Sequence, residues 1–232
     1  MAEEFRMGAI GALPTLTKSC RCSSVARSGS ATNIIRTYNI RTTWDGQPVN
    51  HDPIKITVGP VEYTGHVMLS ASGPFFNDTW RPPNSVVGEP YDRLWDFEVV
   101  EVFFLNDENN YFQVILSPHG MHLVLLYKGK YDLLKDKLPM SYYAAITGPT
   151  WHGVAHIPVE YLPPKVSKFN SHASHGSTLE RKHEALYPAT AGSSRDTHNL
   201  DLFQTIDFKE IVPENWSQNY TSSEWDPIIQ LG

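Results

Sequence analysis

The chain has 232 residues, of which 12% are aromatic and 19% are charged, and its 15 glycines and 17 prolines suit a protein of many short strands and turns. Its net charge is −6, and every acidic residue except Glu3 and Glu4 follows Trp44. An acidic body argues against nucleic acid or an anionic membrane as the main partner. No apolar run reaches the roughly 18 residues that a membrane-spanning helix needs.

The N-terminal segment differs in composition from the rest of the chain. It contains no Asp or Glu from Phe5 onward and is rich in Ser, Thr, Ala and Arg, as organelle transit peptides are. A disordered extension is the alternative. Both cysteines, Cys20 and Cys22, lie here and are too close to staple a domain. We predict an extension over residues 1–34, one domain over 35–232 and a cytoplasmic location, with organelle import through the extension as the alternative.

After the extension, stretches rich in β-branched and aromatic residues alternate with turn residues. The clearest pair flanks Ser117-Pro-His-Gly and predicts a hairpin. No segment sustains a helical period, although one helical turn is expected at Val159–Leu162. About ten strands and one long loop, Asn77–Arg93, predict an all-β fold, an antiparallel β-sandwich. The expected strands are Ile35–Trp44, Pro53–Val58, His66–Ser72, Val99–Leu105, Tyr111–Leu116, His122–Tyr127, Ser141–Ile146, Trp151–Ile157, Lys168–His175 and Phe203–Phe208.

The strand Val99–Leu105 contains the most informative residue. It is apolar on both faces apart from Glu101, which predicts a strand covered on both sides with a carboxylate inside. A buried carboxylate needs a dedicated partner or a polar cavity. Trp95 lies six residues earlier and could form the wall of such a cavity, or could be a core residue while Glu101 pairs with a Lys or Arg. Glu98 and Glu101 face opposite sides of the strand and cannot form an acid/base pair on one face.

The sequence gives little support to metal or nucleophilic chemistry. The pairs His119/His122 and His172/His175 have helical spacing but lie in predicted strands or turns, where they point to opposite faces. A metal site would need histidines from different strands, so no metal ligand is predicted. There is no Gly-x-Ser-x-Gly elbow and no Gly-rich phosphate loop.

A late segment offers a second set of ligand-binding groups. Tyr187 beside Pro188 could present an aromatic face, and Asp196 and His198 precede the last predicted strand. Aromatic rings stack on the C–H face of a sugar while carboxylates accept from its hydroxyls, so these residues would complement Trp95 and Glu101. Ordinary loop packing is the alternative for Tyr187.

Four motifs, in order, resemble an uncharacterised eukaryotic family that includes a vertebrate chromosome-4 open-reading-frame protein. The resemblance covers about residues 38–216. Its motifs are Leu-Trp-Asp-x-Glu-Val-Val-Glu-Val-Phe-Phe-Leu-Asn-Asp from Leu94, Tyr-Phe-Gln-Val-Ile-Leu-Ser-Pro-His-Gly-Met-His-Leu-Val-Leu-Leu from Tyr111, Lys-Phe-Asn-x-His-Ala-x-His-Gly from Lys168, and Glu-Ala-Leu-Tyr-Pro from Glu184.

This family is more distantly similar to family 9 carbohydrate-binding modules and to DOMON-like β-sandwiches, which hold sugars or redox cofactors. Their strand motif matches Trp95 and Glu101 with the same spacing, which implies a sugar slot walled by Trp95 with Glu101 as hydroxyl acceptor. Two departures matter: Gln113 stands where the modules have an Arg, and Tyr187 is the nearest substitute for their second Trp. No motif matches DOMON haem ligation, so the cofactor stays open.

We therefore predict a non-catalytic binder of a small polar ligand, a saccharide by resemblance, with Trp95, Glu101, Gln113, Tyr187, Asp196 and His198 as site residues. One alternative is a glycoside hydrolase that uses Glu101 and Asp196, which would place the two carboxyl groups about 5–10 Å apart across a cleft. Another is a protein-binding scaffold, in which Trp95 would be fully buried.

Overall fold

A computed structural model describes residues 34–61, 65–177, 180–211, 217 and 222–226. The predicted extension therefore lies, apart from its last residue, outside the described residues. The described part of the chain has no helix that is long and apolar enough to cross a membrane.

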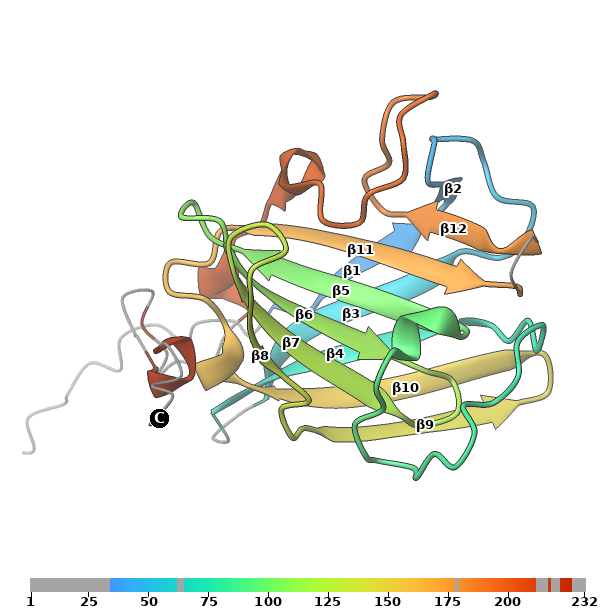
Figure 1. The fold of residues 1–232 in the computed structure, drawn as a ribbon, viewed down its shortest axis with the longest axis horizontal. Helices are drawn as coiled ribbons and strands as arrows, with labels where there is room; N and C mark the ends of the chain where they lie inside the picture. Colours follow the sequence, from blue (N-terminus) through green and yellow to red (C-terminus); the bar gives the residue numbers. More distant parts are fainter. Residues whose placement is uncertain (1–33, 62–64, 178–179, 212–216, 218–221, 227–232) are drawn as a thin grey trace, which may run out of the picture. The chain divides into compact units, whose positions relative to one another are not determined.

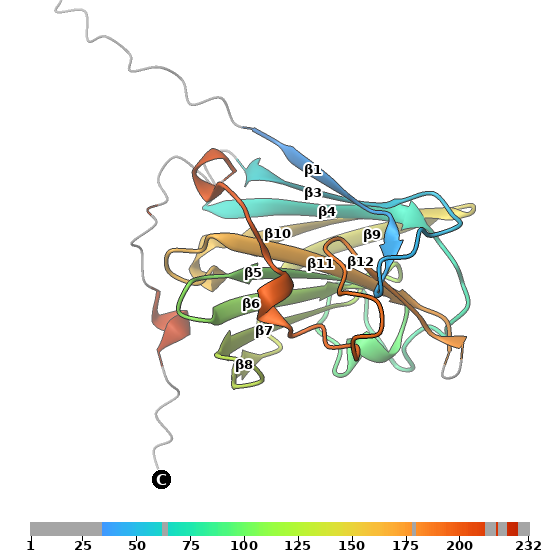
Figure 2. The same ribbon diagram turned by 90° about the horizontal axis from the view of Figure 1, so that it is seen from above.

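Two antiparallel sheets form the domain, as Figure 2 shows in edge view. The first sheet has five strands in the order β1-β3-β4-β10-β9, with β1 and β9 at its edges. The strands of this sheet are β1 (Arg36–Ile40), β3 (Ile54–Val61), β4 (His66–Pro74), β9 (Ser141–Thr147) and β10 (Thr150–Pro158).

The second sheet runs in the order β2-β12-β11-β5-β6-β7-β8 (Figure 1). β13 also pairs with β11. Its strands are β2 (Thr42–Thr43), β5 (Val99–Leu105), β6 (Asn110–Leu116), β7 (His122–Lys128), β8 (Leu133–Asp136), β11 (Lys168–His175), β12 (Lys182–Ala185) and β13 (Gln204–Thr205). The short 3-10 helices are η1 (Leu94–Asp96), η2 (Val159–Tyr161), η4 (Leu200–Leu202), η5 (Phe208–Glu210) and η6 (Ser223–Trp225).

The main hydrophobic core lies between the two sheets. β5 contributes Val100, Val102 and Phe104 to it, opposite residues of β3, β4 and β10. The alternate residues of β5 lie in a second apolar cluster on the outer face of the second sheet, where Leu94 of η1 and Phe203 cover them. All seven residues of β5 are therefore buried, which confirms the prediction of a strand covered on both faces.

Most of the strands predicted from the sequence are present in the two sheets. β5 and β11 have the predicted bounds, and the helical turn expected at Val159–Leu162 is η2. The predicted strand Ile35–Trp44 is two strands, because the chain leaves the first sheet after Ile40 and joins the second at Thr42. β8 and β12 were not expected, and the predicted strand Phe203–Phe208 contains only the two residues of β13.

Candidate functional site

Glu101 lies in the middle of β5 and points to the outer face of the second sheet. Its side chain is only 3% exposed. The strand register places it directly opposite His172 of β11 and Ile115 of β6, and Gln113 lies two residues before Ile115 on the same face of the sheet. The Nε2 atom of Gln113 donates a hydrogen bond of 2.7 Å to Oε2 of Glu101. Two adjacent strands thus hold the Glu101 carboxylate against the Gln113 amide.

Cations oppose the cost of burying this carboxylate. Burial raises the pKa of Glu101, while the positive charge of Arg195, the hydrogen bond from Gln113 and the charge of Arg181 act in the opposite direction. Arg195 lies in the exposed loop after β12, and Arg181 directly precedes the first residue of β12. Both cations that act on the pKa of Glu101 therefore come from outside the strands of the sheet.

Three buried polar atoms near Glu101 have no hydrogen-bond partner among the described residues: Oε1 of Gln113, Nδ1 of His172 and Nε1 of Trp44. The Trp44 and His172 rings are neighbours, with centroids 5.4 Å apart. Burial lowers the pKa of His172 to about 3, so its imidazole is neutral. Leaving such an atom unpaired costs about 1–3 kcal/mol. Together the atoms offer donors and acceptors to a polar molecule.

Aromatic residues surround His198 next to Phe103 on the same face of the sheet. The Nδ1 atom of His198 lies 2.6 Å from the hydroxyl of Tyr111. Its ring packs edge-on against Phe103, which follows Glu101 by two residues on β5, and against Tyr127. Phe103 also packs edge-on against His172. Burial lowers the pKa of His198 to about 4, so its imidazole, like that of His172, is neutral.

Arg181 ties η1 to the second sheet. Its guanidinium donates hydrogen bonds of 2.7 Å to the carbonyl oxygens of both Trp95 and Phe97, one of 3.2 Å to that of Asp96, and one of 2.9 Å to that of Gly176. This arrangement fixes the backbone of Trp95 beside the group whose charge acts on Glu101. The Trp95 side chain is 40% exposed, so part of its ring surface is free.

Asp196 and Tyr187 have other neighbours. Asp196 accepts a short hydrogen bond from the hydroxyl of Tyr131 and pairs with Nζ of Lys130 at 2.6 Å. Burial acts to raise the pKa of Asp196, but these two partners outweigh it and lower the pKa. The Tyr187 ring packs against the core between the sheets, and its backbone N–H donates to Oδ1 of Asn170 at 3.2 Å.

Of the predicted site residues, the structure brings Glu101 and Gln113 into direct contact. Phe103 contacts His198 and lies on the same strand face as Glu101. Four residues that were not predicted also belong to this face: Trp44, His172, Arg181 and Arg195. Of these, His172 alone lies in a strand that the sequence predicts, Lys168–His175. The register that places it opposite Glu101 is not contained in the local sequence.

Comparison with known proteins identifies the relatives of this chain. It is 43% identical over 189 residues to the mouse UPF0462 protein C4orf33 homolog, covering 78% of this chain and 96% of that protein. The human UPF0462 protein C4orf33 is 43% identical, covering 78% and 92%, and the zebrafish homolog is 42% identical, covering 82% and 97%. The chain belongs to the UPF0462 family. The family resemblance predicted from the four motifs is thereby confirmed, while no family model matches the chain.

The UPF0462 fold also has a solved structural neighbour. It is a Bacteroides uniformis protein described as "a putative carbohydrate-binding protein", which matches with a TM-score of 0.56 at 13% sequence identity and covers 74% of this chain and 85% of the neighbour. At this identity the match concerns the fold alone. Together with the two antiparallel sheets it confirms the predicted β-sandwich.

Proposed function

We propose that this UPF0462 protein binds a small, uncharged, hydroxyl-rich ligand, a saccharide, on the outer face of the second sheet at Glu101 and Gln113. The observation that carries the proposal is the buried carboxylate–amide pair of Glu101 and Gln113, with unpartnered buried polar atoms on Gln113 itself, on the adjacent His172 and on Trp44 beside it. Hydroxyl groups both donate and accept, and such a ligand matches a mixed set: Glu101 accepts, Gln113 Oε1 accepts, and Trp44 Nε1 donates.

Aromatic surface supports the saccharide class in particular. Trp95 combines a partly exposed ring with a backbone held by Arg181, and a sugar presents an apolar C–H face to such a ring. The description of the structural neighbour as a carbohydrate-binding protein agrees with this class. Asp196, His198 and Tyr187 stay predicted site residues, with His198 supported by its contact with Phe103.

The alternatives have less support. A hydrolase would need a second carboxyl group free to exchange protons across a cleft with Glu101. Asp196 instead has Lys130 and Tyr131 as direct partners and a lowered pKa. A protein-binding scaffold would bury Trp95 fully, whereas 40% of its side-chain surface is accessible.

A ligand screen with two matched tryptophan variants tests the proposal. The thermal stability of the full chain would be measured with monosaccharides, disaccharides and nucleosides, and a bound ligand at 100 times its Kd should stabilise the fold by about 2.7 kcal/mol. Trp95→Ala should weaken binding of the hit by about 1–3 kcal/mol, the scale of stacked aromatic contacts. Trp80→Ala, which removes a Trp that is 88% exposed, should leave binding unchanged.

Two results would count against the proposal. One is a screen in which no saccharide shifts the melting temperature of the wild-type chain. The other is a saccharide whose affinity falls equally in Trp95→Ala and Trp80→Ala, which would place its binding away from Glu101.

A further inference from the structure

A second group of polar side chains lies at one end of β11 and β12 and is separate from the Glu101 face. The side chains of His51, His175 and Glu184 each bring one ligand atom to a common point, and these atoms all lie within 4.8 Å of one another. Nε2 of His51 is 2.9 Å and Nε2 of His175 is 3.4 Å from the same carboxylate oxygen, Oε1 of Glu184. His51 comes from the loop between β2 and β3, so three separate segments converge here.

The hydrogen bond at Nδ1 of each histidine determines whether its Nε2, which faces Glu184, carries a proton or a lone pair. Nδ1 of His175 lies 2.7 Å from the carboxylate of Asp78, and Nδ1 of His51 lies 2.9 Å from the carbonyl oxygen of Asp52. Both partners are acceptors, so each Nδ1 donates its proton. In the neutral tautomer each Nε2 then presents a lone pair toward Glu184, and two lone pairs would face a carboxylate oxygen. That arrangement is repulsive unless the rings take up a second proton or a metal cation lies between them.

Glu184 supplies a second, independent observation. Its side chain is 2% exposed, and its other oxygen, Oε2, is buried with no hydrogen-bond partner among the described residues. A buried carboxylate with an unsatisfied oxygen needs a compensating positive charge. Asp78 adds a second negative charge next to His175. The cluster thus combines two imidazoles with two carboxylates and favours a dication.

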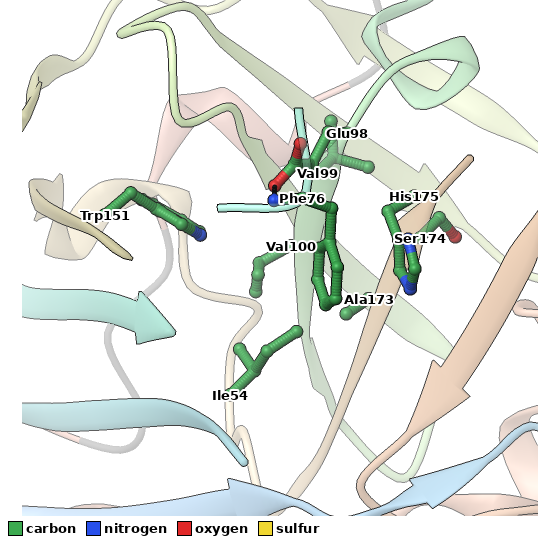
Figure 3. A pocket seen from close by; sticks show the side chains of 9 residues that line it. All are labelled: Ile54, Phe76, Glu98, Val99, Val100, Trp151, Ala173, Ser174 and His175. Atoms are coloured by element: carbon green, nitrogen blue, oxygen red, sulfur yellow. Dashed lines mark hydrogen bonds between the residues drawn. The ribbon is translucent and has the colours of Figure 1, made fainter. Parts of the chain in front are cut away.

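The loop that follows β4 packs against His175 and fixes its ring. Glu98 accepts hydrogen bonds from the backbone N–H groups of Phe76 and Asn77 at 3.1 and 3.0 Å. The ring of Phe76 lies next to that of His175 (Figure 3). The two rings are stacked, and their centroids are 3.5 Å apart. The cavity in this packing is about 10 Å³, room for about one water molecule. The His175 ring therefore has little space to turn.

We propose that His51, His175 and Glu184 form a binding site for a divalent transition-metal ion of the zinc class, with Asp78 as the residue that orients His175. Zinc ligands at about 2.0–2.2 Å in tetrahedral geometry lie roughly 3.3 Å from one another. The two histidine nitrogens lie 2.9 and 3.4 Å from Oε1 of Glu184 and within 4.8 Å of each other. A carboxylate that fixes the distal nitrogen of a metal-binding histidine is the usual outer partner.

The donor set selects the class of metal. Two imidazole nitrogens and one carboxylate suit zinc, cobalt, nickel or copper, whereas calcium and magnesium prefer oxygen ligands alone. Three protein ligands leave a fourth position for water or another small molecule, and His51 is 18% exposed, so solvent reaches the site. This inference is independent of the proposed saccharide site.

Metal titration of the full chain tests the inference. After treatment with a chelator, the chain would be titrated with Co²⁺ and then Zn²⁺, with visible absorption recording cobalt coordination and mass spectrometry counting metal per chain. We expect one metal per chain, a tetrahedral cobalt spectrum and displacement of cobalt by zinc. Asp78→Asn should lower cobalt affinity about 10–100-fold, and His51→Gln should lower it further. His156→Gln, at an exposed histidine of β10, is the matched control and should bind as wild type.

Two outcomes would overturn the inference. The first is a wild-type chain that gives no saturable cobalt spectrum and retains no zinc, which would mean that protonated histidines pair with Glu184 instead. The second is equal cobalt affinity in the wild type and in a His51→Gln variant that circular dichroism shows to be folded. The wild-type titration decides the question even if a variant fails to fold.

Discussion

The buried charge of Glu101 reduces the stability of the fold, as residues kept for ligand binding often do. Its carboxylate is buried on a sheet face, its pKa is raised by burial, and a single amide hydrogen bond reaches it from Gln113. Replacing a buried charge by a neutral group of the same shape is often neutral or stabilising. Residues kept for binding frequently reduce stability in this way.

We expect Glu101→Gln to keep or raise the free energy of unfolding, by up to about 1 kcal/mol, because the variant no longer buries a charge. The same change should abolish saccharide binding, since the ligand loses its carboxylate acceptor. Urea unfolding and calorimetric titration would measure the two quantities. A loss of several kcal/mol of stability would instead show that Glu101 is half of a structural ion pair with Arg181 or Arg195.

His122 gives a pH dependence whose sign follows from its burial. It is fully buried in β7, and desolvation lowers its pKa to about 4 from an ordinary value near 6.5. Between pH 6.5 and pH 4, His122 is protonated in the unfolded chain but not in the folded chain. The free energy of unfolding therefore falls as the pH drops from 6.5 to 4.

We expect His122→Leu to reduce this fall, by roughly 1–3 kcal/mol between pH 7 and pH 4, because each unit of pKa shift corresponds to about 1.4 kcal/mol. The comparison should use the slope against pH, since the leucine also changes packing. Unfolding by urea at several pH values would measure it. A slope identical to that of the wild type would show that His122 does not contribute.

At the scale of elements, Arg181 connects η1 to the β11–β12 hairpin through four backbone carbonyl oxygens. Lysine could not replace it, because only the planar guanidinium presents five donors in a fixed fork. We expect Arg181→Met to speed amide hydrogen exchange in residues 94–97, since that segment loses its anchor. Lys182→Met, at the exposed neighbour, is the control and should leave exchange there unchanged. Equal protection in both variants would mean that packing alone holds η1.

Strands with strong local signals could be predicted from the sequence. β5 is apolar at every position except Glu101 and ends at turn residues, so its bounds follow from side-chain preference. β11 is mostly polar, and its end is marked by Gly176. β8 and β12 have four residues each and include charged side chains, so no local pattern distinguishes them from loops. Their pairing is decided by neighbours far away in the sequence.

The site was less predictable than the fold for the same reason. Glu101 could be identified because a carboxylate in an apolar strand is unusual on its own. The residues around it, His172 and Arg181 among them, become neighbours only through strand register and loop path. The cluster of His51, His175 and Glu184 shows the same limit, since its ligands come from three segments with no common spacing.

At the scale of the whole molecule, the chain joins its two sheets within a few residues. β1 pairs with β3 in the first sheet, and after Arg41 the chain enters β2 at the edge of the second. Ile40, at the end of β1, is fully buried in the core between the sheets. The N-terminal boundary of the folded domain should therefore lie just before β1.

Two truncations test this boundary. Deleting residues 1–33 should leave the melting temperature within a few degrees, because all the described strands remain. Deleting residues 1–40 removes β1 and should cost several kcal/mol through loss of the buried Ile40 and of a strand. Loss of soluble protein from the shorter deletion would show that the extension contributes to folding. Whether residues 1–33 direct import would be tested separately with a reporter fusion.

The edge strand β9 has a consequence for handling the protein. Its sequence, Ser-Tyr-Tyr-Ala-Ala-Ile-Thr, contains no charge, and Tyr143 and Ile146 are exposed. Within the described residues it pairs only with β10, so one row of its backbone amides and carbonyls is open to another strand. Uncharged edges of high β-propensity are where chains add to one another and begin to aggregate. Concentrated samples should therefore associate first through β9, and a lysine in place of Ile146 should keep them monodisperse.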